Sequence, residues 1–367
     1  MKFTCGRQPL YDAVNHVSKG IAQRSTIAAL EGIKIRLSPD NLELTGYDLE
    51  FGIQKNLDVT TSDSGEFVIN ARLFSEAVRR MSGDSVQFEV DDNLNVSMYC
   101  EATEFHISAM SAEEYPALPD MNMEEGMHID QNVLKTMVNQ TSYAACLNEA
   151  KPVLTGELFE VNDSQLSVVA IDGFRLAIRN ENVNAAAPMQ FVVPKRTVTE
   201  VANMLKEDAE EQCVISVSRS HILFEFDGYI VFSRLLEGEF HNYKSSIPPS
   251  FETEVLVNTG ELTKCLERCS LLINSKFNSP IRCTFSGNSL NIRCKTGIGE
   301  INDTIPVKIS GPDVKIGLNN RFLLEAIRAS DCDAVKIQMT GGKRVVKIVP
   351  MQGESFIFLL MPVQIKE

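Results

Sequence analysis

The chain of 367 residues repeats itself with a period of about 124 residues. Leu42, Leu166 and Leu290 lie 124 residues apart, and Asp48 and Asp172 are separated by the same interval. Three Arg-x-x-x-Glu segments keep nearly this spacing, namely Arg72 to Glu76, Arg196 to Glu200 and Arg321 to Glu325. The units of solenoid proteins are only about 20 to 50 residues long. We therefore predict three copies of one domain, each with its own hydrophobic core, over residues 1–124, 125–246 and 247–367.

The apolar residues follow the same order of patterns in each copy. A helix comes first, with apolar residues three and four positions apart, over residues 7–24, 131–145 and 259–276. Alternating strands such as Ile33 to Leu37 follow. A short apolar strand then leads into a second helix, over residues 71–81, 195–206 and 319–329, and hairpin strands close each copy. The predicted class is α+β, with two helices and a mostly antiparallel sheet in each of three tandem domains.

The composition is typical of a globular protein from a reducing compartment. Apolar residues make up 44% of the chain, enough for ordinary cores. The nine cysteines are odd in number and form no Cys-x-x-Cys pattern, so we expect buried, reduced thiols in the cytoplasm. No apolar run approaches the roughly 18 residues of a membrane span, and we expect neither a signal peptide nor a membrane partner.

The charges are distributed unevenly along the chain. The formal net charge is −14, which alone argues against a nucleic-acid partner. The six predicted helical segments, however, hold 15 Lys and Arg against 6 Asp and Glu, whereas the remainder holds 20 against 43. Helices that share one side of an assembly would thus present a basic surface to phosphates. The alternative is that each helix simply has a solvated face. Because Trp is absent, base stacking on single strands is not expected.

No pattern in the sequence indicates catalysis or metal binding. The five histidines lack His-Glu-x-x-His or any other metal-ligand spacing. Cys265 and Cys269 lie on the apolar face of a predicted helix, which favours buried thiols over zinc ligands. Gly341 and Gly342 form a hairpin turn rather than a phosphate-binding loop. We predict no catalytic residue, no metal and no cofactor, although carboxylates that converge only in the fold cannot be seen in a sequence.

Several segments resemble the bacterial DNA polymerase III beta subunit, the sliding clamp. The most specific are Lys151 to Gly156 (KPVLTG), Ala170 to Leu176 (AIDGFRL) and Leu359 to Ile365 (LLMPVQI). Further matches are Met1 to Thr4, Leu44 to Asp48 and Phe232 to Phe240. The resemblance covers the whole chain, at the expected length and with the expected triplication.

The resemblance implies a head-to-tail homodimer that closes into a ring of six like domains. Helices line the hole of such a ring, and sheets form its outer wall. The ring encircles double-stranded DNA without sequence preference and tethers a polymerase, which gives processivity. The implied partners are DNA polymerase III and clamp-loader subunits, which bind through short Leu/Phe peptides, and other replication and repair proteins. No bond is broken, so no enzyme activity is expected.

Two interfaces follow from the resemblance. The candidates for DNA contact are basic residues on or beside the predicted inward helices: Arg24, Arg72, Arg79, Arg80, Lys151, Lys195 and Arg196. The dimer interface joins the first domain of one chain to the third domain of the other. Its candidates are Phe105 and Ile107 on one side and Leu271 and Leu272 on the other, with Glu300 and Asp303 as acidic contacts at the rim.

The resemblance also implies a partner-binding cleft between the second and third domains. Its candidate residues are Leu154, Ile171, Gly173, Phe174, Arg175, Leu176, Leu359, Leu360, Met361, Pro362 and Val363. Chemically this set is an apolar groove with one basic rim, suited to short peptides with Leu or Phe anchors. The sequence departs from the family pattern at His241, Ser245 and Ser246, and the tail continues to Lys366 and Glu367. These departures concern the preference for particular peptides, not the presence of the cleft.

Three classes of function compete at this point. The first is a DNA-encircling clamp, the second a DNA-processing enzyme whose acidic residues form a metal site in the fold, and the third a peptide-binding scaffold that does not engage DNA. Triplication without a catalytic motif disfavours the enzyme. The segregation of positive charge onto the predicted helices disfavours the scaffold.

Overall fold

The same order of elements occurs three times along the chain. The computed structural model describes residues 1–119, 126–184, 187–207, 211–273 and 280–364. Each repeat consists of a strand and a helix, then strands, a second helix and three closing strands. The predicted triplication and the predicted α+β class with mostly antiparallel strands are therefore confirmed.

The first repeat begins with the N-terminal strand. Its elements are β1 (Lys2–Gly6), α1 (Arg7–Val17), the 3₁₀ turn η1 (Ala28–Glu31), β2 (Gly32–Ser38), β3 (Asn41–Tyr47), β4 (Phe51–Asp58), β5 (Gly65–Asn70), α2 (Ala71–Arg80), β6 (Ser85–Val90), β7 (Asn95–Cys100) and β8 (Thr103–Ser108). The side chain of Asn70 caps α2 by accepting a hydrogen bond from the N–H of Leu73, which explains why the helix begins where β5 ends.

The second repeat has the same layout. Its elements are β9 (Met127–Asp130), α3 (Gln131–Thr141), η2 (Ser142–Ala144), η3 (Pro152–Thr155), β10 (Gly156–Asn162), β11 (Gln165–Ile171), β12 (Arg175–Asn182), β13 (Met189–Pro194), α4 (Lys195–Met204), β14 (Gln212–Val217), β15 (His221–Phe226) and β16 (Tyr229–Arg234). The short turn η4 (Tyr243–Ser246) then leads into the third repeat.

The third repeat carries one additional short strand. Its elements are β17 (Thr253–Asn258), α5 (Thr259–Ser270), β18 (Ile281–Ser286), β19 (Ser289–Thr296), β20 (Gly299–Pro306), β21 (Lys308–Ser310), β22 (Val314–Leu318), α6 (Asn320–Ala329), β23 (Ala334–Met339), β24 (Val346–Pro350) and β25 (Phe356–Leu360). Asn258 and Asn319 cap α5 and α6 in the same manner as Asn70 caps α2.

Two of the four sheets join strands from successive repeats. The eight-stranded sheet has the order β5-β2-β3-β4-β16-β15-β14-β9, and the nine-stranded sheet has the order β13-β10-β11-β12-β25-β24-β23-β17-β21. Their junctions are the antiparallel pairs β4–β16 and β12–β25. The two four-stranded sheets, β1-β6-β7-β8 and β20-β19-β18-β22, end in β8 and β20. The junction β12–β25 positions the candidate site described below.

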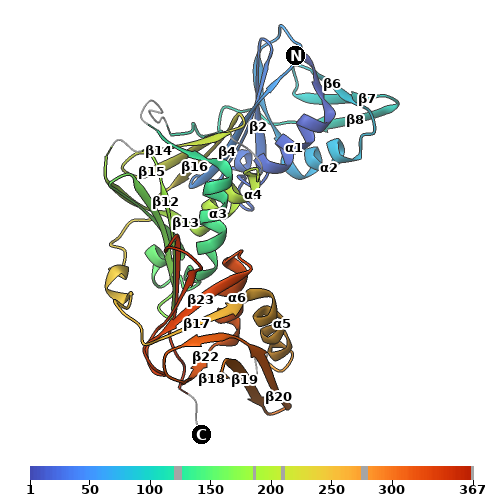
Figure 1. The fold of residues 1–367 in the computed structure, drawn as a ribbon. Coiled ribbons are helices and arrows are strands. Elements are labelled where there is room, and N and C mark those ends of the chain that lie inside the picture. The colour runs from blue at the N-terminus through green and yellow to red at the C-terminus, as the bar shows by residue number, and fades with distance from the viewer. Residues whose placement is uncertain (120–125, 185–186, 208–210, 274–279, 365–367) are drawn as a thin grey trace. The chain divides into compact units, whose positions relative to one another are not determined.

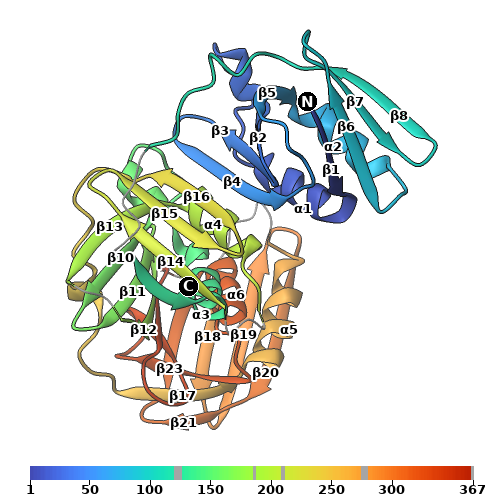
Figure 2. The same cartoon turned by 90° about the horizontal axis from the view of Figure 1, so that it is seen from above.

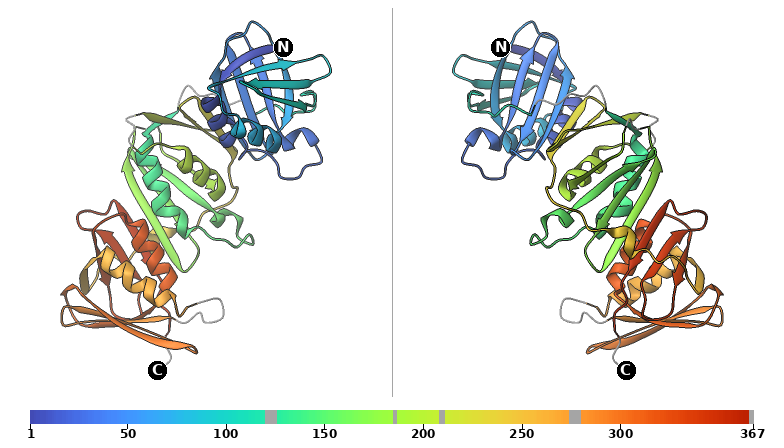
Figure 3. Two further views of the ribbon diagram at one scale, coloured as in Figure 1. Left: turned by 90° about the vertical axis from the view of Figure 1, so that its right-hand side faces the viewer. Right: turned by 90° about the vertical axis from the view of Figure 1, so that its left-hand side faces the viewer.

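The contacts divide the chain into two compact units (Figure 1). One comprises residues 1–132 and 203–235, and the other comprises residues 133–202 and 236–367. In the first unit, α1 and α2 lie side by side against the strands of the first repeat (Figure 1). In the second unit, α5 lies along β20 (Figure 2), and α5 and α6 are neighbours (Figure 3).

Each helix buries the apolar stripe that its periodicity predicts. On α5, for example, Leu262, Cys265, Leu266 and Cys269 are fully buried. Leu73 on α2 lies outside this buried stripe, and its side chain is 57% exposed. All nine cysteines lie in the described residues as free thiols, eight of them buried. Within the described residues, no helix is long and apolar enough to cross a membrane.

The helices are shorter than the predicted segments, which weakens the charge argument. α1 ends at Val17, so Lys19 and Arg24 lie in the following loop, and Lys206 follows the end of α4. The predicted segment 259–276 included Lys276, which lies outside the described residues. Within their observed bounds, α1 and α5 each carry equal numbers of positive and negative side chains. The positive sign is therefore shared by four of the six helices of the described chain, not by all six.

One carboxyl group is buried inside the second repeat. Glu157 on β10 is fully buried, and it accepts hydrogen bonds from the hydroxyls of Ser142 and of Thr141, the latter at 2.6 Å. Burial raises the pKa of Glu157 from 4.5 to about 7, against the opposing effect of the two hydroxyls. Because the folded-state pKa is the higher one, the folded protein holds this proton more tightly than the unfolded chain does.

Replacing this carboxyl group is expected to remove a pH dependence of stability. Between pH 4.5 and 7 the free energy of unfolding should fall as the pH rises, by on the order of 3 kcal/mol from Glu157 alone. The substitution Glu157→Gln should remove this slope, measured as urea midpoints across the interval. Glu149→Gln, which alters an exposed carboxyl group in the loop before η3, should leave the slope unchanged. Equal slopes in the Glu157→Gln protein and the unaltered chain would contradict the assignment.

Candidate functional site

An open pocket lies at the junction where β12 pairs with β25. Its enclosed volume is about 60 Å³. The lining residues come from distant parts of the second unit: Ile171, Gly173, Phe174, Arg175, Leu176, Ser246, Val345, Leu359 and Met361. Seven of the eleven residues predicted for the cleft are thus brought together by the fold. Ser246 and Val345 are additional to that set.

Strand pairing explains the apolar floor of the pocket. Leu176 on β12 lies opposite Leu359 on β25, and both are buried in one apolar cluster with Ile171. Adjacent residues on a strand point to opposite faces of the sheet. Arg175 and Leu360, which are also paired across β12 and β25, consequently point to the other face. The floor is therefore made by one side of two strands that are far apart in the sequence.

A tight turn before β12 forms one wall. The Oδ1 atom of Asp172 accepts hydrogen bonds from the N–H groups of Phe174 (2.9 Å) and Arg175 (3.0 Å). Gly173 between them has a φ of +90°, a conformation that residues with a Cβ rarely adopt. The turn leaves the Phe174 side chain 65% exposed, which is unusual for a large apolar group. This phenyl ring is available to a ligand.

The segment after β25 forms the opposite wall. The N–H of Met361 donates a hydrogen bond to the carbonyl oxygen of Phe174 at 2.8 Å, and the N–H of Val363 donates to Gly317 on β22 at 2.9 Å. The Met361 side chain is 49% exposed beside the pocket. These two hydrogen bonds hold the tail between the turn and β22.

The remaining predicted cleft residues have other positions. Leu360 is buried with the core of the third repeat, on the face of β25 opposite the pocket, so its assignment to the groove was wrong. Leu154 packs at the edge of the pocket-side cluster, and Pro362 and Val363 continue the tail without lining the pocket. A sequence pattern shows that Leu359 and Leu360 face opposite ways, but it does not show which of them faces the pocket.

The predicted basic rim is also absent at Arg175. Its side chain is only 7% exposed and pairs with two carboxylates, Asp172 at 2.9 Å and Glu325 on α6. The two negative charges outweigh the charge of this guanidinium. The wall of the pocket at Arg175 therefore offers a ligand no free positive charge, and the pocket is apolar there.

Only one of the three departures from the family pattern touches the pocket. Ser246, at the end of η4, lines it, whereas His241 and Ser245 are exposed and outside the lining. Lys366 and Glu367 lie outside the described residues. The departure that bears on ligand preference is thus a small polar group in an otherwise apolar lining.

Comparison with known proteins gives the same family for every part of the chain. Models of the DNA polymerase III beta subunit match as its N-terminal domain over residues 1–119, its central domain over 128–242 and its C-terminal domain over 244–364. A crystal structure of a putative DNA polymerase III beta subunit from Eubacterium rectale is 32% identical, with 99% of each chain covered and a TM-score of 0.93. The chain belongs to the DNA polymerase III beta subunit family, the bacterial sliding clamps.

Relatives from Bacillus subtilis agree with this assignment. The curated beta sliding clamp of strain 168 is 29% identical over 377 residues, covering 99% of this chain and 100% of the relative. The crystal structure of the Bacillus subtilis DNA polymerase sliding clamp has a TM-score of 0.95 at 29% identity, with 100% of both chains covered. The resemblance of the sequence to sliding clamps is therefore confirmed over its full length.

The residues predicted to contact DNA lie in varied surroundings. Arg24, Arg72 and Lys151 are exposed, with Arg24 and Lys151 in loops and Arg72 on α2. Arg79 and Arg80 both pair with Glu76, at 2.8 and 3.0 Å, so part of their charge is already offset. The remaining two, Lys195 and Arg196, open α4, and Lys195 is half-buried close enough to act electrostatically on Glu157.

The predicted dimer residues lie on β8, on β20 and at the end of α5, and β8 and β20 are each an end strand of a four-stranded sheet. Phe105 and Ile107 on β8 are half-buried and stand opposite Met98 and Val96 of β7, which are fully buried. Leu271 at the end of α5 is 80% exposed. Leu272 instead packs against the core of its repeat. Its side chain also lies close to Gly299 on β20.

The two predicted acidic rim residues are paired within their own chain. Asp303 accepts from Arg268 on α5, with Nε at 2.7 Å, and Glu300 accepts from Arg293 on β19. Glu300 and Asp303 are three positions apart on β20, so their side chains face opposite sides of that strand. Both carboxylates therefore already have a positively charged partner within their own chain.

Two exposed apolar side chains near these strands were missed by sequence reasoning. Ile298, in the turn between β19 and β20, is 58% exposed and adjoins Gly299, beside Leu272. Leu73 on α2 is 57% exposed. A single exposed apolar residue inside a helix or a turn leaves no periodic signal, because periodicity reports only the face that is buried.

Proposed function

We propose that the chain forms a head-to-tail homodimeric ring that encloses duplex DNA and tethers the replicative polymerase through the pocket. The observation that carries this proposal is the match of three successive domains to one clamp family, at full length and in family order. The Bacillus subtilis relatives bear the name sliding clamp, which supports the same role here. The chain is proposed to act in the cytoplasm and to catalyse no reaction.

A ring of this kind needs little affinity for DNA. Contacts from Lys and Arg to phosphates are sequence-independent and weaken with salt, so the ring can slide. The ring remains on the DNA because it encloses the duplex, not because it binds the phosphates tightly. A polymerase held by the ring has a high effective concentration at the primer end. No chemical step is required for this role.

The proposed DNA-facing residues are the exposed basic groups on or beside helices. Arg24, Arg72 and Lys151 come first in this set, and each of them is exposed. Arg79, Arg80, Lys195 and Arg196 complete the set. Glu76 reduces the expected contribution of Arg79 and Arg80, since a phosphate must compete with this carboxylate for them.

The proposed dimer contact joins β8 of one protomer to β20 and α5 of its partner. Both strands end a sheet, and an end strand can pair with another chain. Phe105 and Ile107 would meet Leu271 and Leu272, with Leu73 and Ile298 adding apolar area. Glu300 and Asp303 would then act at the rim mainly by orienting Arg293 and Arg268, which they already bind.

The proposed partners of the pocket are short peptides with Leu or Phe anchors. DNA polymerase III, clamp-loader subunits and other replication and repair proteins would present them in turn. An open apolar groove on a water-soluble surface is typical of an interaction site. Exchange between partners favours micromolar dissociation constants, which correspond to about 8 kcal/mol. Anchors of one or two side chains can supply such an energy.

Retention on circular DNA tests the ring. The chain, loaded onto a nicked plasmid by a bacterial clamp loader, should co-elute with the plasmid in gel filtration and dissociate after the plasmid is linearised. Cleavage of the plasmid on addition of Mg²⁺ would instead favour a DNA-processing enzyme. No retention on either form, with peptide binding intact, would favour a scaffold that does not engage DNA.

Charge reversal at two exposed residues is expected to shorten the lifetime of the loaded ring. We choose Arg24→Glu with Arg72→Glu, because reversing Lys195 would also place a negative charge near the buried Glu157. The lifetime on circular DNA should fall several-fold, and its salt dependence should become shallower because fewer phosphates are neutralised.

The matched control reverses two exposed lysines on strands, Lys308→Glu with Lys315→Glu, which gives the same change in net charge. This control protein should behave like the unaltered chain. If both double variants shorten the lifetime equally, the effect reflects net charge, and Arg24 and Arg72 are not specific contacts.

A further inference from the structure

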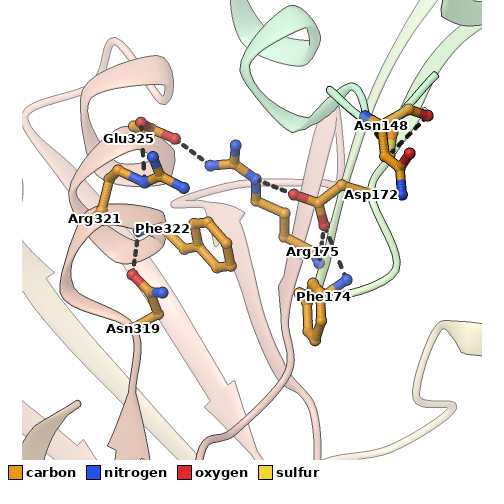
Figure 4. A network of polar contacts seen from close by, with 9 residues as sticks. Asn148, Asp172, Phe174, Arg175, Asn319, Arg321, Phe322 and Glu325 are labelled. Atoms are coloured by element: carbon orange, nitrogen blue, oxygen red, sulfur yellow. Dashed lines mark hydrogen bonds and ion pairs between the residues drawn. The ribbon is translucent and has the colours of Figure 1, made fainter. Parts of the chain in front are cut away.

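The pocket wall at the turn before β12 is connected to helix α6 by a buried ionic network (Figure 4). The guanidinium of Arg175 lies at its centre, with only 7% of the side chain exposed. It donates to Oδ2 of Asp172 at 2.9 Å and to Glu325 on α6. The ring of Phe322, also on α6, lies 4.3 Å from the guanidinium carbon.

Asp172 links this network to the backbone of the pocket. One of its carboxylate oxygens binds the Arg175 side chain, while the other binds the N–H groups of Phe174 and Arg175. The orientation of the carboxylate therefore determines the conformation of the turn. Phe174 in turn accepts the hydrogen bond from Met361. A continuous path of contacts thus runs from Glu325 to both walls of the pocket, as Figure 4 shows for the residues up to Phe174.

Glu325 belongs to this network but does not line the pocket. Its side chain is 34% exposed. A second, weaker partner is the exposed Arg321, whose Nε lies 3.9 Å from Oε1 of Glu325. A role of Glu325 in ligand binding would therefore be indirect, through Arg175 and Asp172.

We propose that Glu325 is a positioning residue for the peptide pocket, holding the 172–175 turn and the Met361 tail in their binding conformation through Arg175. The proposal rests on the proposed function of the pocket. A wall that is already ordered does not lose conformational freedom when the ligand binds, so the affinity is higher. Without Glu325, the buried guanidinium keeps one carboxylate partner but is no longer held against α6 from the other side.

The decisive variant is Glu325→Gln, which preserves the size of the side chain and removes its charge. We expect the dissociation constant for a polymerase-derived Leu/Phe peptide, measured by fluorescence polarisation, to rise about tenfold. The matched control is Glu267→Gln. It removes a carboxylate that pairs with Arg328 at 2.6 Å across α5 and α6 of the same repeat, and it should leave the affinity unchanged.

A double-mutant cycle distinguishes positioning from general destabilisation. In an Arg175→Met background, Glu325→Gln should have no further effect on affinity, because its route to the pocket has been removed. Additive losses of affinity would overturn the proposal. Hydrogen exchange of the backbone amides tests the same proposal in the absence of peptide. The Met361 N–H, which donates to Phe174, should exchange faster in Glu325→Gln than in Glu267→Gln.

The outcomes separate this inference from the proposed function. Unchanged affinity in Glu325→Gln, together with a loss of affinity in the wall variant Met361→Ala, would overturn the positioning role and leave the pocket assignment intact. Absence of peptide binding by the unaltered chain would overturn both. Should Glu325→Gln not fold, Glu325→Asp keeps the charge with a shorter reach and is expected to raise the dissociation constant about threefold. Unchanged affinity in that protein would overturn the proposal.

Discussion

Deleting Met361 to Glu367 is expected to reduce peptide affinity by at least about 20-fold while leaving the dimer intact. The deletion removes the side chain of Met361 from the pocket wall and the hydrogen bond that its N–H donates to Phe174. Exposing one buried apolar anchor costs about 2 kcal/mol, which corresponds to a factor of roughly 20 to 30 in the dissociation constant. Fluorescence polarisation with a Leu/Phe peptide measures the change.

A shorter deletion provides the control. Removing only Ile365 to Glu367 keeps Met361, Val363 and both hydrogen bonds of the tail to the rest of the unit. This protein should bind the peptide as well as the full chain does. If it loses affinity as strongly as the longer deletion, then the additional C-terminal residues are part of the site. Undiminished affinity in the longer deletion would refute the pocket assignment.

Placing a charge at Leu271 is expected to convert the dimer into monomers. The Leu271 side chain is 80% exposed within its own chain, so Leu271→Glu should not disturb the fold. In the proposed interface this side chain meets the apolar groups of β8. A carboxylate there has no partner and loses hydration, which costs several kcal/mol and raises the dimer dissociation constant at least 100-fold. Sedimentation at low micromolar concentration should then show one species of monomer mass.

Leu147→Glu is a closely matched control, because Leu147 is also 80% exposed but lies in the loop between η2 and η3. That protein should remain dimeric. Leu272 is a poorer choice for the test, since it packs against the core and its truncation would also lower stability. A dimer that persists in Leu271→Glu places the interface elsewhere, and loss of dimer in both proteins would indicate a general effect of surface charge.

Local patterns predicted the elements and their order well, for a physical reason. A helix such as α5 buries one stripe, and that stripe is visible as apolar residues three and four positions apart. The pocket has no such local signal. Leu176 and Leu359 become neighbours only because β12 pairs with β25, across about half of the chain. Resemblance to a known family placed them together, whereas periodicity could not.

The errors share a different cause. The sequence shows that Arg175 is basic, but its pairing with Glu325 on α6 joins residues 150 positions apart and appears only in the fold, and its pairing with Asp172 depends on the turn before β12. Leu360 was misplaced because alternation along a strand does not reveal which face is the core. The predicted helical segments also extended beyond the observed C-terminal ends of the helices, so basic residues of the following loops were counted as helical. The errors at Arg175 and Leu360 concern how a residue meets other parts of the fold, and the remaining error concerns where a helix ends.

The pairing of β25 with β12 also bears on protein synthesis. Every other helix and strand of the described residues precedes β25, so the ribosome produces this strand after all of them. A nascent chain can form the sheets of the first repeat, and even β10 to β13, before residues 356–363 emerge. During that time the pocket lacks Leu359 from its floor and the wall formed by Met361. A partner that uses the proposed pocket therefore cannot bind there until residues 356–363 have emerged, and chains that stall before that point do not compete for it.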